Sequence, residues 1–272
     1  MSKWQCRWSP TLGKLEATHQ KIWGTENYRD IEKPCIFFGL YGLPDFMVLR
    51  QHKGKRAILW AGSDIRHFVS GYWIDDKGKI KIDPKPLAKW INKNCESWIE
   101  NKVEYDALKK FGIKSRICPS FLGDVNKFKI SFKSNNKLYS SVSGNDFKLY
   151  GWDKIDKLAG ENKDIEFHLY GNTKPFKTKN KNIILHGRVS KGQMNKEIKQ
   201  MAGAIRMTEF DGFSEIIAKS VLMGQYPVSL IKYPHTISPE KIRDILKKKK
   251  PNIKGREYFI KILNKFIWNT KN

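Results

Sequence analysis

The chain has 272 residues, of which 40% are hydrophobic and 29% are charged. This composition supports a folded core and excludes wholesale disorder. No apolar run approaches the roughly 20 residues that span a bilayer, and the N-terminus lacks a secretory signal, so we expect a cytoplasmic protein. The excess of 52 Lys and Arg over 27 Asp and Glu gives a net charge of +25, which favours polyanionic partners such as DNA, an anionic membrane or nucleotide phosphates.

Cysteine and histidine are too scattered along the chain to predict a metal site or a disulfide framework. The four cysteines form no CxxC pair, and the six histidines form no HExxH motif. We therefore expect reduced thiols, no bound metal and no cofactor.

Short apolar runs alternate with helical stretches, a pattern typical of βα units with parallel sheets. In the first half the pattern predicts strands over 35–39, 57–61, 95–99 and 116–118, and helices over 44–52, 86–93 and 102–111. Residues 127–133 alternate apolar and basic side chains, as in a strand or an extended connection. In the second half it predicts strands over 138–142, 165–171, 183–189, 204–207 and 227–230, and helices over 152–159, 191–201 and 213–223.

This order of elements predicts an α/β fold with two Rossmann-like, doubly wound domains that face a cleft. We place the first domain at residues 1–122 and the second at 123–254. An amphipathic helix within 255–272 is expected to pack back on the domains.

Glycine or small polar residues follow nearly every predicted strand. In open α/β sheets, ligands bind beyond the carboxyl ends of the strands. The residues expected at these ends are Gly39, Gly42, Gly62, Ser63 and Asp64 in the first half, and Gly144, Gly187, Arg188, Arg206 and Thr208 in the second. Their recurrence at one strand after another predicts a ligand site along these sheet edges.

The stretch 206–228 carries the strongest local pattern. A strand leads through Arg206 and Thr208 to a loop over 211–214 (DGFS), which opens a helix. Main-chain N–H groups at a helix start attract phosphate, and the planar guanidinium of Arg206 suits phosphate oxygens. We therefore predict that this loop receives a diphosphate, with Ser214 as a further donor.

This stretch resembles the donor-site signature of retaining GT-B glycosyltransferases of the family 4-like group (group 1). In that group an acidic–Gly–Phe loop opens a helix that ends before Pro-Val. The segments ILWAGSDI (58–65), IEFHLYG (165–171) and IILHGRV (183–189) are similar to other strand ends of the same group. The resemblance implies a GT-B-like fold and a metal-independent, hexosyltransferase-like enzyme with a nucleotide-sugar donor, most often UDP-linked.

The resemblance also implies roles for individual residues. The first domain would face the acceptor, and the second would bind the donor. Donor binding falls to Gly144, Lys148, Gly187, Arg188, Arg206, Thr208, Asp211, Gly212, Phe213, Ser214, Glu215 and Lys219, and the acceptor side to Gly39, Gly42, Gly62 and Ser63. Asp64 would orient or deprotonate an acceptor hydroxyl as the catalytic residue, and a helix cap is an equally good interpretation of it.

Lys219 departs from the group, which has a glutamate there that binds the donor ribose. Lysine cannot accept a hydrogen bond from a sugar hydroxyl. Three explanations stay open: Glu215 substitutes one turn earlier, Lys219 meets a phosphate, or the donor site is altered. Ala61 is a second departure, because it replaces a histidine of the group.

Three hypotheses for the acceptor follow. The first is transfer to a glycan or lipid-linked acceptor, with basic patches on an anionic membrane. The second is a DNA glycosyltransferase that modifies a hydroxymethylated pyrimidine base, and the third is a non-catalytic GT-B-like protein that binds nucleic acid. The commoner use of the fold favours glycans, whereas the charge favours DNA. The protein would then be cytoplasmic and peripheral at the membrane or on DNA.

Overall fold

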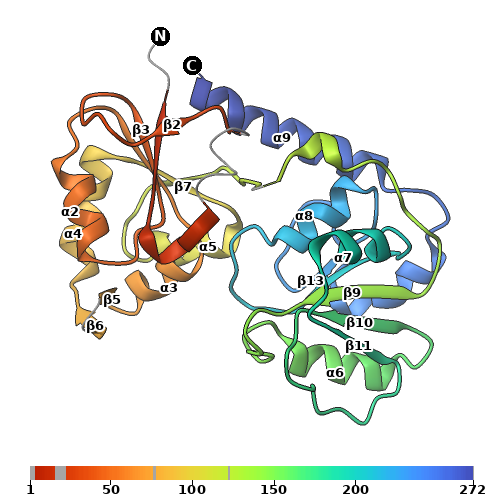
Figure 1. Ribbon diagram of the computed structural model, residues 1–272. Coiled ribbons are helices and arrows are strands. Elements are labelled where there is room, and N and C mark those ends of the chain that lie inside the picture. The colour runs from red at the N-terminus through yellow and green to blue at the C-terminus, as the bar shows by residue number, and fades with distance from the viewer. Residues whose placement is uncertain (1–3, 16–22, 76–77, 122, 272) are drawn as a thin grey trace. The chain divides into compact units, whose positions relative to one another are not determined.

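The computed structural model describes residues 4–15, 23–75, 78–121 and 123–271, which form two compact units (Figure 1). The N-terminal unit comprises Met1–Gly123, Phe210–Phe213 and Ile262–Asn272. The C-terminal unit comprises Asp124–Glu209 and Ser214–Lys261. Each unit has its own parallel sheet and its own core.

The N-terminal unit is built on a six-stranded sheet in the order β2-β1-β3-β4-β7-β8, and all of its neighbouring strands are parallel. The strands are β1 (Gln5–Trp8), β2 (Glu26–Asn27), β3 (Cys35–Phe38), β4 (Arg56–Leu59), β7 (Glu96–Ile99) and β8 (Ser115–Ile117). A separate antiparallel hairpin pairs β5 (Tyr72–Asp75) with β6 (Gly78–Lys81). The strand order reverses between β1 and β3, which is where ligands bind in sheets of this kind.

Alternate residues of the strands enter two different cores, because successive side chains of a strand point to opposite faces. Phe37 and Ile58 share one core with α2 (Leu43–Gln51), α3 (Ser63–Val69), α4 (Pro84–Asn94) and α5 (Lys102–Lys109). Ile36 and Phe38 point the other way and pack with a cluster that includes Trp8. A 3-10 helix, η1 (Pro10–Leu15), follows β1.

The C-terminal unit has a five-stranded parallel sheet in the order β11-β10-β9-β12-β13. Its strands are β9 (Lys137–Ser141), β10 (Glu166–Tyr170), β11 (Ile183–Gly187), β12 (Gly203–Arg206) and β13 (Val228–Ser229). The helical elements are η2 (Val125–Lys127), α6 (Trp152–Glu161), α7 (Lys191–Ile198), α8 (Glu215–Leu222), η3 (Pro239–Lys247) and the first part of α9 (Ile253–Lys271), whose residues from Ile262 onward belong to the N-terminal unit. The strand order reverses between β9 and β12.

Helices cover both faces of this second sheet, with α6 on one side and α7 and α8 on the other (Figure 1). On the α6 side, Trp152 and Ile155 pack with Phe167 of β10. On the other side, the Tyr170 hydroxyl donates to Glu197 of α7 at 2.7 Å. The C-terminal unit is therefore doubly wound, as predicted.

The predicted strands and helices of both halves are present, with ends that differ by a few residues. The strands β1 and β2 and the β5–β6 hairpin were not predicted from the sequence. The alternating stretch 127–133 forms no strand: Phe132 packs against the core of the C-terminal unit, whereas the side chain of Ile130 is 49% exposed. Within the ranges that the structure describes, no helix is both long and apolar enough to cross a membrane.

Two glycines at the carboxyl end of the second sheet share a left-handed backbone but differ in the space around them. Gly171 has φ +88°, and a Cβ atom there would lie 2.4 Å from the carbonyl oxygen of Val142. Gly144 has φ +67° and no atom within 4 Å of such a Cβ. Gly171 therefore lets the ends of β9 and β10 touch, whereas Gly144 borders open space.

We predict that Gly171→Ala destabilises the C-terminal unit by about 3 kcal/mol, because backbone strain and overlap with Val142 add up. Gly144→Ala is the matched control and should cost only about 1–2 kcal/mol, the strain of a left-handed alanine. Urea unfolding of both variants measures the difference. Equal free energies of unfolding would contradict the close approach at Gly171.

Candidate functional site

The carboxyl ends of four strands meet at one edge of the C-terminal unit. Tyr170 pairs in register with Ser141 on one side and with Gly187 on the other. Arg206, the last residue of β12, lies at the same level, and its Nη1 donates to the carbonyl oxygen of Ser141 at 3.4 Å. The predicted strand-end residues Gly187 and Arg206 thus lie at the edge where the strand order reverses.

Arg206 is oriented by an aromatic ring as well as by this hydrogen bond. Its guanidinium lies 4.3 Å from the ring centroid of Tyr150, within the range of a cation–π contact. The neighbouring Gly151, which caps α6, makes this possible, since a Cβ there would lie 2.3 Å from the main chain of Met207. The start of α6 therefore reaches the end of β12, and a planar cation is fixed at the switch point.

Asn145 joins the loops that follow β9 and β10. Its Oδ1 accepts hydrogen bonds from the main-chain N–H groups of Thr173 and Lys174, at 2.7 and 3.0 Å, and its Nδ2 donates to Thr173 Oγ1 at 2.6 Å. The adjacent Asn172 is buried, and its Oδ1 has no hydrogen-bond partner among the described residues. Gly144, with open space beside it, belongs to the loop after β9, next to Asn145.

The other predicted donor residues of this unit differ in exposure. Lys148 and Arg188 are exposed, whereas Thr208 and Ser214 are buried. Ser214 is the N-cap of α8, but its side chain makes no capping hydrogen bond.

Lys219 is half-buried on α8 and faces both a carboxylate and a second lysine. Burial lowers its pKa, the negative charge of Glu215 raises it, and the positive charge of Lys191 lowers it. The structure thus brings Lys219 close to Glu215, one turn earlier on the helix.

The predicted diphosphate loop is only partly available for that role. Asp211, Gly212 and Phe213 belong to the N-terminal unit, and the N–H group of Phe213 donates to Glu100 Oε2 at 2.5 Å. The Nδ2 of Asn101 donates to the carbonyl oxygen of Asp211 at 2.7 Å. The expectation that this loop presents its N–H groups to a diphosphate is therefore wrong for Phe213, because a carboxylate of the protein already accepts that group.

Asp64 is completely buried, in contrast to the expectation of a residue that faces an acceptor. Its Oδ2 accepts the N–H of Leu40 at 2.8 Å, and its Oδ1 accepts those of Ala61 and Ile65 at 3.0 and 2.8 Å. Burial raises its pKa to about 6. The prediction of a catalytic Asp64 is thus corrected, because the carboxyl group fastens the ends of β3 and β4.

The glycines predicted for the acceptor side are explained by close packing of the chain on itself. A Cβ atom would lie 2.4 Å from the carbonyl oxygen of Ile74 at Gly42, and 2.8 Å from the Tyr41 ring at Gly39. At Gly62 it would lie 2.7 Å from the nitrogen of Gly212. The space at these three glycines is therefore filled by the protein rather than open to an acceptor. Ser63 is half-buried, and its Oγ bonds the Tyr41 hydroxyl at 2.8 Å.

Sequence reasoning missed three buried polar residues at this edge of the N-terminal unit. Asp45 accepts hydrogen bonds from the Ser9 hydroxyl at 2.8 Å and from the N–H of Tyr41 at 3.0 Å. Glu100 and Glu104 follow β7 and are also buried. Burial raises the pKa of Glu100 to about 7, and burial with the charge of Glu100 raises the pKa of Glu104. The one sequence signal for these three residues is that each follows a predicted strand.

A chain of four titratable side chains crosses β10, β11 and α7. His168 Nε2 lies 3.2 Å from Glu166, His168 Nδ1 lies 2.8 Å from His186 Nε2, and His186 Nδ1 lies 3.3 Å from Glu197. Burial lowers the pKa of both histidines. We refer to these four residues as the histidine chain. The spacing of Glu166 and His168, two residues apart on one strand face, is the only sequence signal for it.

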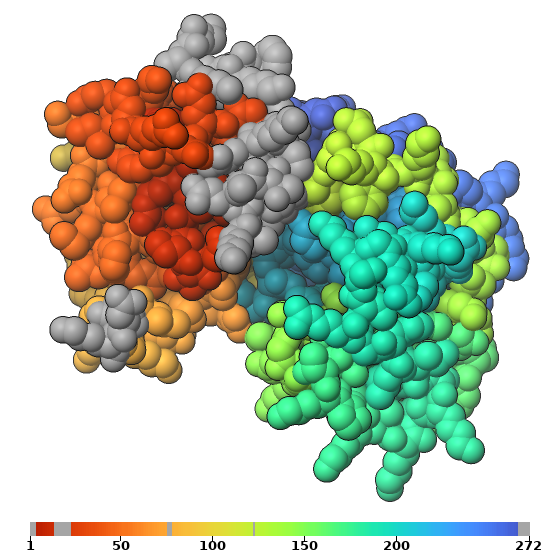
Figure 2. All heavy atoms as spheres, viewed as in Figure 1, coloured from red at the N-terminus to blue at the C-terminus, as the bar shows by residue number. Residues whose placement is uncertain are grey.

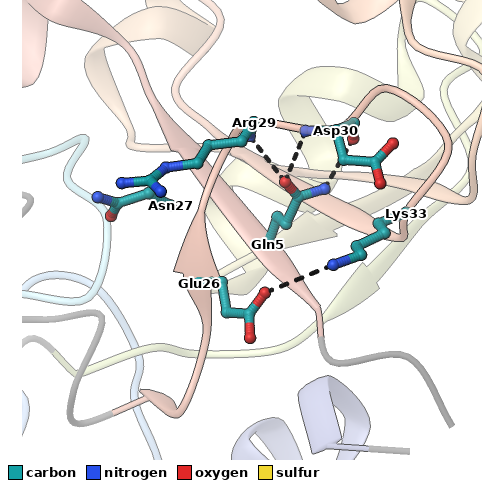
Figure 3. Close-up of a pocket in the computed structure, with 6 residues that line it drawn as sticks. All are labelled: Gln5, Glu26, Asn27, Arg29, Asp30 and Lys33. Carbon is teal, nitrogen blue, oxygen red and sulfur yellow. Dashed lines mark hydrogen bonds and ion pairs between the residues drawn. The ribbon is translucent and has the colours of Figure 1, made fainter.

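A surface pocket of about 460 Å³ lies elsewhere, at the amino ends of β1 and β2 (Figure 3). Gln5 lies at its base, and its side chain bonds Arg29 and Asp30 through three main-chain hydrogen bonds of 2.7–2.9 Å. Because Gln5 begins its strand, the pocket is at the opposite sheet edge from Gly39 and Gly62. Among the described residues, no group of three or more His, Cys, Asp or Glu is arranged to hold a metal ion.

The chain is similar in fold to solved structures of other proteins. No family model and no curated protein matches its sequence. The solved structure of TarM matches with a TM-score of 0.53 and 16% identity, over 89% of this chain and 53% of that one. Sucrose-phosphate synthase from Thermosynechococcus elongatus matches with a TM-score of 0.51 and 10% identity, over 88% of this chain and 69% of that one.

A second TarM structure, from S. aureus, has a TM-score of 0.52 and 15% identity, over 89% of this chain and 53% of that one. That protein is in complex with Fondaparinux, alpha-GlcNAc-glycerol and UDP. The chain spans about half the length of the TarM chains that it matches. These likenesses, together with the two parallel sheets, confirm the prediction of a GT-B-like α/β fold.

The histidine chain predicts how the stability of the C-terminal unit depends on pH. Because burial lowers the pKa of His168 and His186, the folded state favours neutral rings, whereas the unfolded chain takes up protons near pH 6.5. The stabilisation that the two neutral rings contribute is therefore fully present above about pH 6.5, and it is lost as the pH falls below that value. We predict a loss of at least about 1 kcal/mol between pH 7.5 and 5.5.

The double variant His168→Gln/His186→Gln should flatten this dependence, as measured by urea unfolding at both pH values. Tyr170→Phe is the matched control, since it removes one hydrogen bond of Glu197 but keeps both titrating rings. It should lower the stability by a similar amount at both pH values. An unchanged slope in the double variant would contradict the assignment.

Proposed function

We propose that the protein is a glycosyltransferase that binds a nucleotide sugar, UDP-linked in the first instance, at the carboxyl edge of the C-terminal sheet. The observation that carries this proposal is the fixed guanidinium of Arg206 at the point where the strand order reverses. Sheets of this kind bind ligands at that point. A planar cation held there matches the charge and geometry of a diphosphate.

The surrounding loops support the same ligand. Gly144 leaves room for a ligand to approach the main chain, and the exposed Lys148 and Arg188 come from flanking segments. Together with Arg206 these cations would offset the charge of a leaving diphosphate without a metal ion. The likeness to TarM, which binds UDP in one of its structures, favours UDP over other nucleotides.

Lys219 is proposed to face the phosphates rather than the ribose. A glutamate at this position would accept hydrogen bonds from sugar hydroxyls, which lysine cannot do. Glu215 lies close enough to act on the charge of Lys219, so it would supply a carboxylate for a hydroxyl. The residues of this site would therefore divide the two roles between successive turns of α8.

The acceptor is proposed to be a glycan or lipid-linked glycan, with DNA as the second candidate because of the charge. The C-terminal unit contains 28 Lys and Arg against 13 Asp and Glu. The loop between β10 and β11 exposes Lys174, Lys177, Lys179 and Lys181, within the green-to-teal surface of Figure 2. Seven of the eight tryptophans whose burial the structure describes are buried, which argues against their use as wedges between DNA bases.

The test of the proposed enzyme is a screen of UDP, GDP and ADP sugars for binding and slow hydrolysis. We expect one donor to bind, and Arg206→Ala to weaken its binding by about 10–100-fold, the value of a charge-assisted hydrogen bond. Lys199→Ala is the matched control, because it removes an equal charge at the C-cap of α7, at the opposite edge of the sheet. Equal binding by Arg206→Ala and the control would refute the donor site, and the absence of any bound donor would refute the enzyme.

A salt series on duplex DNA, together with a transfer assay, separates the two acceptor classes. Duplex DNA should bind weakly and lose affinity steeply between 50 and 200 mM salt if the basic surface acts only through counterion release. Sugar transfer to duplexes with hydroxymethylated bases, at any salt concentration, would favour DNA over a glycan acceptor.

A further inference from the structure

Residues Phe210–Phe213 are held within the N-terminal unit by both their main chain and a side chain. The carbonyl oxygen of Asp211 accepts a hydrogen bond from Asn101, and the N–H of Phe213 donates to Glu100. The ring of Phe210 packs against the core formed by α2–α5. We call residues 210–213 the docked segment.

Glycine is required on both sides of this contact. A Cβ atom at Gly212 would lie 2.4 Å from Glu100 Oε2, and one at Gly62 would lie 2.7 Å from the nitrogen of Gly212. The main chain of the docked segment therefore touches the loop after β4 and the carboxyl group of Glu100. Residues of the N-terminal unit therefore determine where the docked segment lies and which groups its main chain contacts.

The carboxyl groups of Glu100 and Glu104 receive very different numbers of donors. Glu100 accepts the N–H and the hydroxyl of Ser120, at 3.1 and 2.5 Å, and the N–H of Phe213 at 2.5 Å. Glu104 accepts the N–H of Glu100 at its Oε2, at 2.7 Å, whereas its buried Oε1 has no hydrogen-bond partner among the described residues. Three donors stabilise a carboxylate, whereas a buried oxygen without a donor favours the neutral acid.

We propose that Glu100 is a positioning residue, whose carboxylate holds the docked segment through the N–H of Phe213 while Glu104 stays protonated beside it. The functional part of this inference rests on the proposed function, since the docked segment contains Asp211, Gly212 and Phe213, three of the donor residues that the family resemblance implies. Two charges in one buried pair repel each other strongly. The proton on Glu104 therefore keeps the charge on the oxygen that Phe213 contacts.

The first experiment measures hydrogen exchange of the Phe213 amide by NMR on the full-length protein. Glu100→Gln replaces one acceptor oxygen by an NH₂ group, so either Phe213 or Ser120 loses its partner. We expect the protection factor of the Phe213 amide to fall by about 10–100-fold. Protection of the Ile91 amide in α4 serves as the check that the unit stays folded.

Two further variants make the assignment specific. Glu104→Gln mimics a neutral acid and should change the protection of Phe213 by less than about threefold. Asp106→Asn makes the same carboxyl-to-amide change at an exposed ion pair with Lys102 and should leave it unchanged. A loss in Glu104→Gln as large as that in Glu100→Gln would place the charge on Glu104 and overturn the proposal, as would full protection in Glu100→Gln.

A pH series adds a readout that a purely structural residue would not move. The pKa of Glu100 is raised to about 7, so its charge is lost as the pH falls through that value. The protection factor of Phe213 should therefore decrease from pH 8 to pH 6 in the wild type and stay flat in Glu100→Gln. A flat profile in the wild type would refute the dependence on a charged carboxylate.

Donor binding tests whether the hold of Glu100 on the docked segment matters for the proposed function. The ligand in this experiment is the nucleotide sugar that the screen above identifies. Glu100→Gln should raise its Kd by about tenfold, and Asp106→Asn should not change it. An unchanged Kd in Glu100→Gln, with Phe213 deprotected, would overturn the link to donor binding. If the wild type binds no nucleotide sugar, the proposed function fails, and the exchange data still decide whether Glu100 holds the segment.

Discussion

Buried carboxylates that accept hydrogen bonds fix the loops at the carboxyl edge of the N-terminal sheet. Asp45 joins the loops after β1 and β3, Asp64 joins those after β3 and β4, and Glu100 joins the loop after β8 to Phe213. A buried carboxylate is costly unless hydrogen bonds replace its lost hydration. Each of these groups has two or more such donors, and the same donors would otherwise be unsatisfied main-chain or hydroxyl groups. The geometry of this edge therefore depends on charges that water does not reach.

The loops at the carboxyl edge of the C-terminal sheet are fixed by different groups. Its loops are fastened by neutral groups, such as the Asn145 amide and the glycine contacts at Gly151 and Gly171. A cation at this edge, Arg206, is supported by an aromatic ring. A cation fixed at the end of a strand attracts an anionic ligand. The two edges thus differ in the groups that fix their loops, although both sheets are parallel.

Most of the fold was readable from the sequence, because strands buried on both faces are continuous apolar runs. The run Cys35–Phe38 is one example, and all four of its residues are buried. In contrast, β1 mixes Gln, Cys, Arg and Trp, and its polar side chains are satisfied by partners that local periodicity does not reveal. Residues 127–133 have the alternation of a strand but form none, and the five-stranded sheet of their unit ends at β11 and β13.

The site was readable only in part. The place of Arg206 at a strand end followed from the apolar run before it, and the structure adds the Tyr150 ring that orients it. The partners of Asp211 and Phe213 lie more than 100 residues earlier in the chain, at Asn101 and Glu100. Pairings at that separation arise from tertiary packing, and no pattern of spacing in a single sequence encodes them.

The number of protons in the histidine chain does not match the number of its contacts. Three contacts link Glu166, His168, His186 and Glu197, and a hydrogen bond in each contact needs one proton. Two neutral imidazoles carry only two. Whichever tautomers the rings adopt, one contact must set a bare nitrogen lone pair against an oxygen or nitrogen lone pair. The array is therefore one proton short of a complete set of hydrogen bonds whenever both rings are neutral, and protonation of one ring supplies the missing proton.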